Sequence, residues 1–354
     1  TGEGRSSTVT LNEDARPSTL QIPGVEPVSY RYDARGRVEV VTQGTRELSL
    51  AYDSGGYLAA VTTDDGTTAL SRDSMGRIEE ATRVDASVIP FTWDALGNLT
   101  GLTAPGRTSA YQMTNDLRGD LLTMTTPLGY ETTYTFDLDY RPTGMTSADG
   151  RSTSVSYDSS NRIEQLVING EHVDFTYADT GQPADIVGGS TDLAYEWDGP
   201  LLTSQQSTGT APGLLTYAWE DGTLNLAEMN LNGTVIPYEF DTDGVPISIG
   251  RQTLRFQSGT TFLTERQVGN VLVSYTYDSY GQLECERSRY NNATLLERTY
   301  SYDALGRVTE IVDDSVVGTT THTYSYDLLG QLVAAEGTGA LPYSHSYGYD
   351  PNGN

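Results

Sequence analysis

The stretch Tyr300-Ser301-Tyr302-Asp303-Ala304-Leu305-Gly306-Arg307-Val308 decides how this chain folds, because copies of it recur along the sequence. Two copies are nearly intact, Tyr30-Arg31-Tyr32-Asp33-Ala34-Arg35-Gly36-Arg37-Val38 and Tyr324-Ser325-Tyr326-Asp327-Leu328-Leu329-Gly330-Gln331-Leu332. With the Asp of the motif as a marker there are 17 copies, at Asn12, Asp33, Asp53, Asp73, Asp94, Asp116, Asp137, Asp158, Ala178, Asp198, Glu220, Asp241, Gln257, Asp278, Asp303, Asp327 and Asp350. Most lie 20 to 22 residues apart, which predicts a tandem repeat.

Aromatic residues gather at two positions of each copy, directly before the marker and two residues before that. These positions hold all three Trp, five of the six Phe and 17 of the 24 Tyr. Side chains two residues apart on a strand point to the same face of the sheet. Each copy is therefore predicted to place an aromatic pair on one face of a β-strand.

Turn residues follow each strand. The third residue after the marker is Gly in 11 of the 17 copies and Asn161 in another. An Asp at the first turn position bonds the backbone further on, and Gly or Asn takes the positive φ that closes a short hairpin. A second turn comes about 11 residues after the marker, as at Asn169-Gly170 and Asn232-Gly233. Each repeat is thus strand, turn, strand, turn, and no stretch shows the helical period.

The predicted fold class is all-β, with tandem hairpins of about 21 residues forming a long curved antiparallel sheet. Some 34 strands, each about 4.8 Å from the next, would make a flat sheet roughly 160 Å wide with one aromatic face. Because such a sheet would aggregate, we expect it to curl. We predict one repeat domain over residues 1–354. The ending Asp350-Pro351-Asn352-Gly353-Asn354 stops inside a hairpin turn, so we expect the chain to be a fragment of a longer polypeptide.

Charge and composition exclude several classes of function. The net charge is −27, and all 21 basic residues are Arg. Without Lys there is no Walker A or Schiff-base lysine, and the acidity argues against nucleic acid as a partner. No apolar run is long enough to span a membrane. The single cysteine, Cys285, allows no internal disulfide, and its acidic neighbours are expected to raise its pKa.

Candidate catalytic groups have ordinary explanations. The histidines His172, His322 and His345 are far apart in sequence and are interpreted as exposed or packed. Carboxylate pairs occur at Asp64/Asp65, Asp241/Asp243, Asp313/Asp314 and Glu284/Glu286, and two of them could in principle support glycoside hydrolysis. In so acidic a chain such pairs arise freely. We therefore predict no catalytic residue, no cofactor, no metal and no enzymatic activity.

The tandem Tyr-x-Tyr-Asp-x-x-Gly-Arg pattern resembles that of the Rhs/YD-repeat family over essentially the whole chain. The repeat signature falls on Tyr30, Tyr32, Asp33, Gly36, Tyr300, Tyr302, Asp303, Gly306, Tyr324, Tyr326, Asp327 and Gly330. The resemblance implies a sheet that spirals into a hollow shell or barrel. In bacterial Rhs toxins and insecticidal toxin complexes the shell encloses a C-terminal toxin domain, and in teneurins a similar barrel serves adhesion. Wall-associated bacterial members also exist, and the family's self-cleaving segment is not found in this sequence.

Two functions follow from the resemblance. The first is a non-catalytic shell segment that encloses or presents a C-terminal, toxin-like domain, with the remainder of its own chain as partner. The alternative is an extracellular surface module that binds glycans or cell-surface proteins. Either implies a secreted or cell-surface bacterial protein, and the absence of Lys suggests a GC-rich genome.

Overall fold

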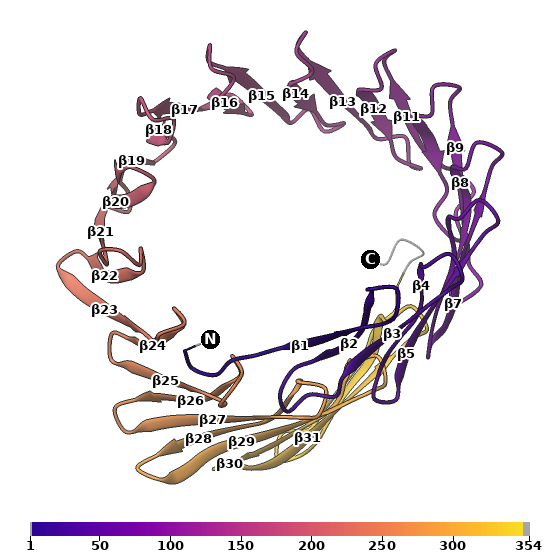
Figure 1. Ribbon diagram of the computed structural model, residues 1–354. Coiled ribbons are helices and arrows are strands. Elements are labelled where there is room, and N and C mark those ends of the chain that lie inside the picture. Colours follow the sequence, from indigo (N-terminus) through magenta and orange to yellow (C-terminus); the bar gives the residue numbers. More distant parts are fainter. Residues whose placement is uncertain (1, 350–354) are drawn as a thin grey trace. The chain divides into compact units, whose positions relative to one another are not determined.

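The protein consists of β-strands joined by tight turns, as the repeat pattern predicts. The computed structural model describes residues 2–349, and these contain 33 strands and no α-helix (Figure 1). The estimate of some 34 strands is close to this number. The last marker, Asp350, lies outside the described residues.

The chain forms two compact units, which are treated separately. One contains the residues up to Pro90 together with those from Phe240 onward, and the other contains Phe91–Glu239. The boundaries fall inside β9 (Val88–Trp93) and at the end of β23 (Thr234–Phe240). That residues 1–354 make a single domain remains a prediction.

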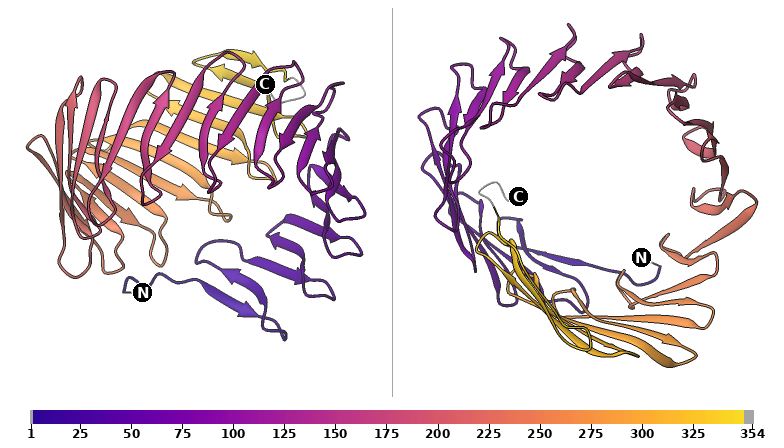
Figure 2. Two further views of the ribbon diagram at one scale, coloured as in Figure 1. Left: turned by 90° about the horizontal axis from the view of Figure 1, so that it is seen from above. Right: turned by 180° about the vertical axis from the view of Figure 1, so that it is seen from behind.

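The first unit begins with the strands β1 (Thr8–Leu11), β2 (Pro17–Gln21), β3 (Val28–Tyr32), β4 (Val38–Gln43), β5 (Arg46–Tyr52), β6 (Leu58–Thr63), β7 (Gly66–Arg72) and β8 (Ile78–Thr82). It ends with β24 (Pro246–Ile249), β25 (Gln252–Phe256), β26 (Leu263–Val268), β27 (Val271–Tyr277), β28 (Leu283–Tyr290), β29 (Ala293–Tyr302), β30 (Val308–Ser315), β31 (Gly318–Tyr326), β32 (Leu332–Gly339) and β33 (Tyr343–Ser346). Figure 2 (left) shows the indigo N-terminal segment running along the ends of the orange hairpins.

The second unit holds β10 (Leu99–Leu102), β11 (Tyr111–Asn115), β12 (Leu121–Thr125), β13 (Glu131–Phe136), β14 (Pro142–Thr146), β15 (Ser152–Tyr157), β16 (Ile163–Ile168), β17 (Glu171–Tyr177), β18 (Pro183–Gly188), β19 (Thr191–Asp198), β20 (Leu201–Gly209), β21 (Gly213–Trp219) and β22 (Leu226–Leu231). In Figure 1 these strands follow one another around an arc.

Strands adjacent in sequence pair antiparallel, and the pairing places the repeat positions in register. In β3–β4, Tyr30 lies opposite Val41, and a bulge between Arg31 and Tyr32 precedes the turn. The same irregularity recurs before the turn in β15–β16 and β29–β30. A positive-φ residue three positions after the marker, Gly36 at +79°, closes this bulged hairpin. The predicted Asp-x-x-Gly turn is therefore confirmed.

Neither unit has a conventional core. Among residues 2–349 the buried apolar residues are Val40, Ala104, Val273 and Ala335. Most of the aromatic residues three positions before the marker are half-buried. The residues that lie between the two aromatic positions, such as Ala51 and Thr176, are exposed. Stability must therefore come mainly from contacts between neighbouring repeats, as in other repeat proteins.

Candidate functional site: the Tyr-Asp turn and the seam

The turn that carries the marker, called here the Tyr-Asp turn, is held by its own carboxylate. In the copy at Asp33, Oδ1 accepts hydrogen bonds from the backbone N–H groups of Arg35 and Arg37, each at 2.9 Å. The N–H of Gly36 donates to the carbonyl of Asp33 at 2.9 Å. These bonds satisfy backbone groups that a tight turn would otherwise leave unpaired.

The second oxygen of the marker carboxylate binds the arginine four residues later. Arg37 Nη2 lies 2.6 Å from Asp33 Oδ2, and the same ion pair recurs within the turns at Arg77–Asp73, Arg141–Asp137, Arg162–Asp158 and Arg307–Asp303. The backbone N–H and then the guanidinium of Arg37 hold the pKa of Asp33 below its usual range. At Asp303 burial raises the pKa, but the hydrogen bonds from Arg307 outweigh it and the net shift is downward. Each carboxylate is thus kept ionised by its own turn.

The tyrosine directly before the marker links each repeat to the preceding one. Tyr52 Oη donates to the carbonyl of Val38 at 2.8 Å, and Tyr302 Oη donates to that of Leu283 at 2.6 Å. The acceptor is the first residue of the strand after the preceding Tyr-Asp turn. The same bond is made by Tyr32, Tyr157, Tyr177, Trp197, Tyr277, Tyr326 and Tyr349. Trp219 donates to the carbonyl of Leu202, the second residue of β20.

Two copies without an aromatic residue keep this inter-repeat bond. Arg72 Nη2 donates to the carbonyl of Leu58 at 3.2 Å, and Asn115 Nδ2 donates to that of Leu99 at 3.2 Å. A side chain with a donor at its tip can therefore make this bond without an aromatic ring. A sequence search for aromatic pairs alone misses these two copies.

The turn arginine stacks on the tyrosine of the next repeat. The Arg37 guanidinium carbon lies 4.0 Å from the centre of the Tyr52 ring, and Arg162 lies 4.3 Å from that of Tyr177. Arg141–Tyr157 and Arg307–Tyr326 are arranged similarly, at 4.5 and 5.0 Å. Each such contact contributes about 0.5–1 kcal/mol at partly exposed sites. Marker, arginine and following tyrosine thus form a chain of contacts that passes from one repeat to the next.

The predicted signature residues occupy these roles. Tyr32, Tyr302 and Tyr326 donate to the preceding repeat, while Asp33, Asp303 and Asp327 accept from their own turns. Gly36, Gly306 and Gly330 all have positive φ. Tyr30, Tyr300 and Tyr324 lie in the strand row that faces Val41, Ile311 and Ala335.

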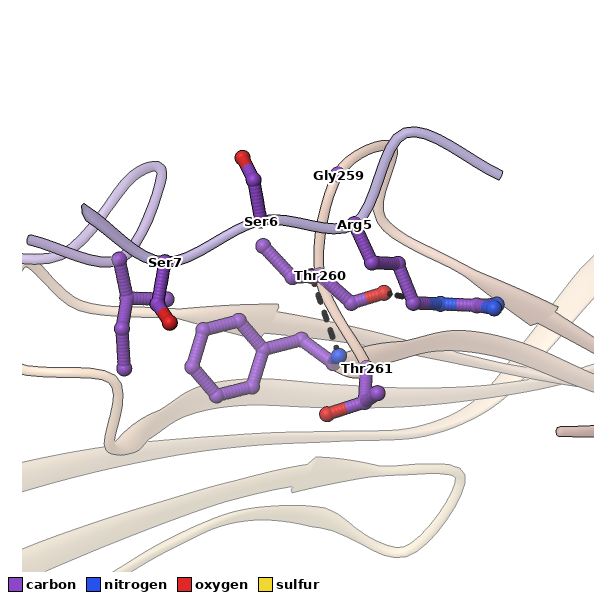
Figure 3. A pocket seen from close by; sticks show the side chains of 8 residues that line it. Arg5, Ser6, Ser7, Gly259, Thr260 and Thr261 are labelled. Carbon is purple, nitrogen blue, oxygen red and sulfur yellow. Dashed lines mark hydrogen bonds between the residues drawn. The ribbon is translucent and has the colours of Figure 1, made fainter. Parts of the chain in front are cut away.

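Tyr-Asp turns of residues 241–307 bind residues 2–66 of the same unit, and we call this contact the seam. At one end Arg5 donates to Asp241 at 2.6 Å, to Asp243 at 3.0 Å and to the carbonyl of Thr260 at 2.9 Å. Figure 3 shows Arg5 reaching Thr260 across the turn. A cavity of about 370 Å³ beside this contact is lined by Ile22 and Phe262, among others.

Further along the seam, the Tyr-Asp turns of the later repeats meet the second turns of the earlier repeats, such as the turn between β4 and β5. Tyr280 Oη lies 3.1 Å from Thr45 Oγ1, and the Arg46 guanidinium lies 3.9 Å from the centre of the Tyr280 ring. Arg46 also donates to the side chain of Gln282. The seam is therefore made of polar and charged side chains, with arginines contributed from both sides.

Most of the carboxylate pairs considered as catalytic candidates are engaged in ion pairs. Asp241 and Asp243 bind Arg5, Asp65 binds Arg307, and Asp313 binds Arg298 at 2.6 Å. Within the part of the chain that the structure describes, no three His, Cys, Asp or Glu side chains are grouped so as to hold a metal ion.

The structure brings together two of the three histidines. His322 Nδ1 lies 2.9 Å from Tyr343 Oη, and the ring of His345 stacks on Tyr343 with centres 5.2 Å apart. Cys285 lies beside Glu297 and Arg287 in a polar hollow. Burial and then the Glu297 carboxylate raise the pKa of the thiol, as expected from its acidic surroundings.

The model of the teneurin YD-shell family matches residues 3–354. The chain belongs to the YD-shell family. This confirms the resemblance drawn from the Tyr-Asp repeat.

Solved structures show the same fold for this YD-shell chain. TcdB2-TccC3-TEV and TcdB2-TccC3-Cdc42 superpose with TM-scores of 0.69 and 0.64 at 16% identity, and TcdB2-TccC3 with 0.53 at 14%. Each alignment covers 99% of this chain but 24% of the other, so the chain spans about a quarter of those proteins. No curated protein matches. The YD-shell fold is that of structural shell modules.

No helix in the described residues has the length and apolar character needed to cross a membrane.

Proposed function

We propose that this chain is a wall segment of a hollow shell that encloses or presents a C-terminal, toxin-like domain of its own polypeptide. The observation that carries the proposal is the seam, where turns of residues 241–307 bind residues 2–66. Such contacts bond one layer of repeats to another, as a wall of stacked layers requires. The likeness to the TcdB2-TccC3 structures supports this function.

Exclusion is the mechanism of such a wall. A continuous hydrogen-bonded sheet leaves no gap between strands, and the seam covers turn edges that would otherwise face solvent. The side chains best suited to chemistry are used for ion pairs, as at Asp241 and Asp313. The wall needs neither a nucleophile nor a cofactor, and we propose that this segment is not an enzyme.

The proposed setting is the cell surface or the extracellular medium. A net charge of −27 keeps so much half-exposed apolar surface soluble through mutual repulsion. The partners are further repeats and the enclosed domain of the same polypeptide.

Imaging and protection experiments test the shell. Electron microscopy of the chain should show a wall around a central space, and a protease-sensitive domain fused after Asn354 should be digested slowly. The variant Arg5→Ala/Arg307→Ala opens the seam and should accelerate digestion, whereas the control Arg151→Ala, whose partner Asp149 lies two residues away in an exposed turn, should not. An extended strip without a central space, or equal digestion in all three proteins, would contradict the proposal.

Surface recognition is the second candidate function. Tyr57, Tyr130 and Tyr140 are 51%, 60% and 57% exposed at turns, and exposed aromatic rings can stack on sugars. A glycan array probed with the wild-type chain and with Tyr57→Ala/Tyr130→Ala tests this function. Binding that the double variant loses would support it, and an array without signal would contradict it.

A further inference from the structure

Two second turns of the second unit have the sequence Asn-Gly, which leaves the asparagine amide open to spontaneous loss. They are Asn169-Gly170, between β16 and β17, and Asn232-Gly233, between β22 and β23. The φ angles are +51° and +90° in the first turn and +50° and +88° in the second. These values are typical of the two-residue hairpin turn that Asn and Gly favour. Within residues 2–349 no other Asn is followed by Gly.

The two turns are anchored in the same way. The N–H of Asn169 donates to the carbonyl of Ser152 at 2.8 Å, and the N–H of Ser152 donates to Asn169 Oδ1 at 2.9 Å. Asn232 makes the same two bonds with Leu214, at 2.9 and 2.7 Å. The asparagine side chain thus replaces a backbone carbonyl and extends the ladder beyond the strand. All four turn residues are exposed, and no described atom lies within 4 Å of where a Cβ on either glycine would be.

One hydrogen bond distinguishes the two turns. The N–H of Gly233 donates to Asn230 Oδ1 at 2.8 Å. In the other hairpin the residue two positions before the turn asparagine is Val167, whose side chain has no acceptor. The two positions correspond in register, since each lies one residue pair before the pair that closes its turn. The N–H of Gly170 accordingly donates to no group of residues 2–349.

This N–H belongs to the nucleophile in asparagine deamidation. After losing its proton to hydroxide, the glycine nitrogen attacks Cγ of the asparagine, and the new N–C bond closes a cyclic imide. The side-chain nitrogen takes a proton from water and leaves as ammonia, and a second water molecule opens the imide to aspartate or isoaspartate. Glycine hinders the attack least because it has no Cβ. A hydrogen bond from the same N–H to a neighbouring acceptor must break first, which slows the reaction.

We propose that Asn169 is a site of spontaneous modification to aspartate and isoaspartate, and that Asn230 protects Asn232 from the same reaction. Attack at Asn169 requires its two bonds to Ser152 to open. Attack at Asn232 requires two such bonds and, in addition, the bond from Gly233 to Asn230 to open. One neutral hydrogen bond corresponds to about a fivefold difference in rate. Aspartate at position 169 keeps an oxygen for the N–H of Ser152, whereas isoaspartate adds a methylene group to the backbone and disrupts the turn.

Peptide mapping by mass spectrometry, after incubation in mildly alkaline buffer, measures both sites in the same molecules. The wild type should lose the amide at Asn169 about fivefold faster than at Asn232. Asn230→Ala frees the N–H of Gly233 and should raise the rate at Asn232 to that at Asn169. The control Glu228→Gln, two residues earlier on β22, should leave both rates unchanged.

Placing the protecting residue in the other hairpin gives the decisive result. Val167→Asn puts an amide oxygen at the equivalent position of β16 and should slow the loss at Asn169 about fivefold. A hairpin loosened by this substitution would react faster, so slowing can come only from the new bond. Equal rates at Asn169 and Asn232 in the wild type would overturn the proposal. So would an Asn230→Ala chain in which Asn232 reacts no faster than before.

Discussion

Arg307 and Asp65 are 242 residues apart in the sequence, yet their side chains form a two-pronged ion pair. Arg307 Nη1 lies 2.7 Å from Asp65 Oδ2, and Nη2 lies 3.2 Å from Oδ1. Through Nε, Arg307 also binds Asp303 of its own turn at 2.6 Å. One guanidinium therefore stabilises a turn and fastens that turn across the seam.

Removing this arginine should loosen the seam. Arg307→Ala should lower the free energy of unfolding by about 1–2 kcal/mol, because two partly buried carboxylates lose a charged donor. In a double-mutant cycle with Asp65→Asn the coupling should be about 0.5–1 kcal/mol. Urea denaturation measures both quantities, and a coupling of zero would show that the seam contact adds no stability.

The tyrosine link between repeats can be tested by deleting one hydroxyl. Tyr52→Phe removes the bond to the carbonyl of Val38 and should cost about 1 kcal/mol, measured by urea denaturation. Tyr30→Phe is the matched control, since Tyr30 lies three positions before the marker and its hydroxyl makes no hydrogen bond to any of residues 2–349. An equal decrease in the free energy of unfolding in both variants would refute the role assigned to the tyrosines directly before the marker.

Acid should weaken the turns. The guanidinium of Arg77 lowers the pKa of Asp73, and the backbone N–H of Arg162 lowers that of Asp158. Because these pKa values are lower in the folded state, the stability they give is present above the unfolded value of about 3.9 and is lost as pH falls through the folded values. The urea concentration at the midpoint of unfolding should therefore decrease once the pH is lowered below about 4. The variant Asp73→Asn should be less stable at neutral pH and should depend less on pH in this window.

Backbone strain at the third turn position can be tested in both directions. Gly97 has φ of +92° with open space where a Cβ would lie, so Gly97→Ala should cost about 1 kcal/mol from φ alone. Ala15 has φ of +59°, so the native alanine is strained there. Ala15→Gly should relieve part of that strain and should not destabilise the protein. Thermal denaturation compares the two variants, and a harmless Gly97→Ala would show that the turn does not need glycine.

Cys285 should react slowly with thiol reagents at neutral pH. Burial and Glu297 raise the pKa of its thiol, so the reactive thiolate is scarce. The variant Glu297→Gln should accelerate modification by a disulfide reagent, while Glu265→Gln, which is not among the carboxylates that act on the thiol, should not. A wild-type rate that matches a free cysteine peptide would contradict this prediction.

Much of the architecture follows from local sequence. The spacing of Tyr30, Tyr32 and Asp33 places two aromatic rings on one strand face, and the positive φ at Gly36 closes the hairpin. These relations span only a few residues, and backbone stereochemistry is enough to predict them. The aromatic rows were correctly located, but the bond from the second tyrosine to the preceding repeat depends on how neighbouring hairpins align.

The sequence by itself determined the repeat, its strands, its turns and its family, because each depends on residues within one hairpin or between neighbours. Tertiary structure alone decided which distant turns meet, as when Arg5 binds Asp241 and Arg307 binds Asp65. Most Tyr-Asp turns look alike in sequence, so nothing local tells which are covered by a distant hairpin and which stay exposed. That choice depends on the accumulated twist and curvature of many strands, which no single repeat encodes.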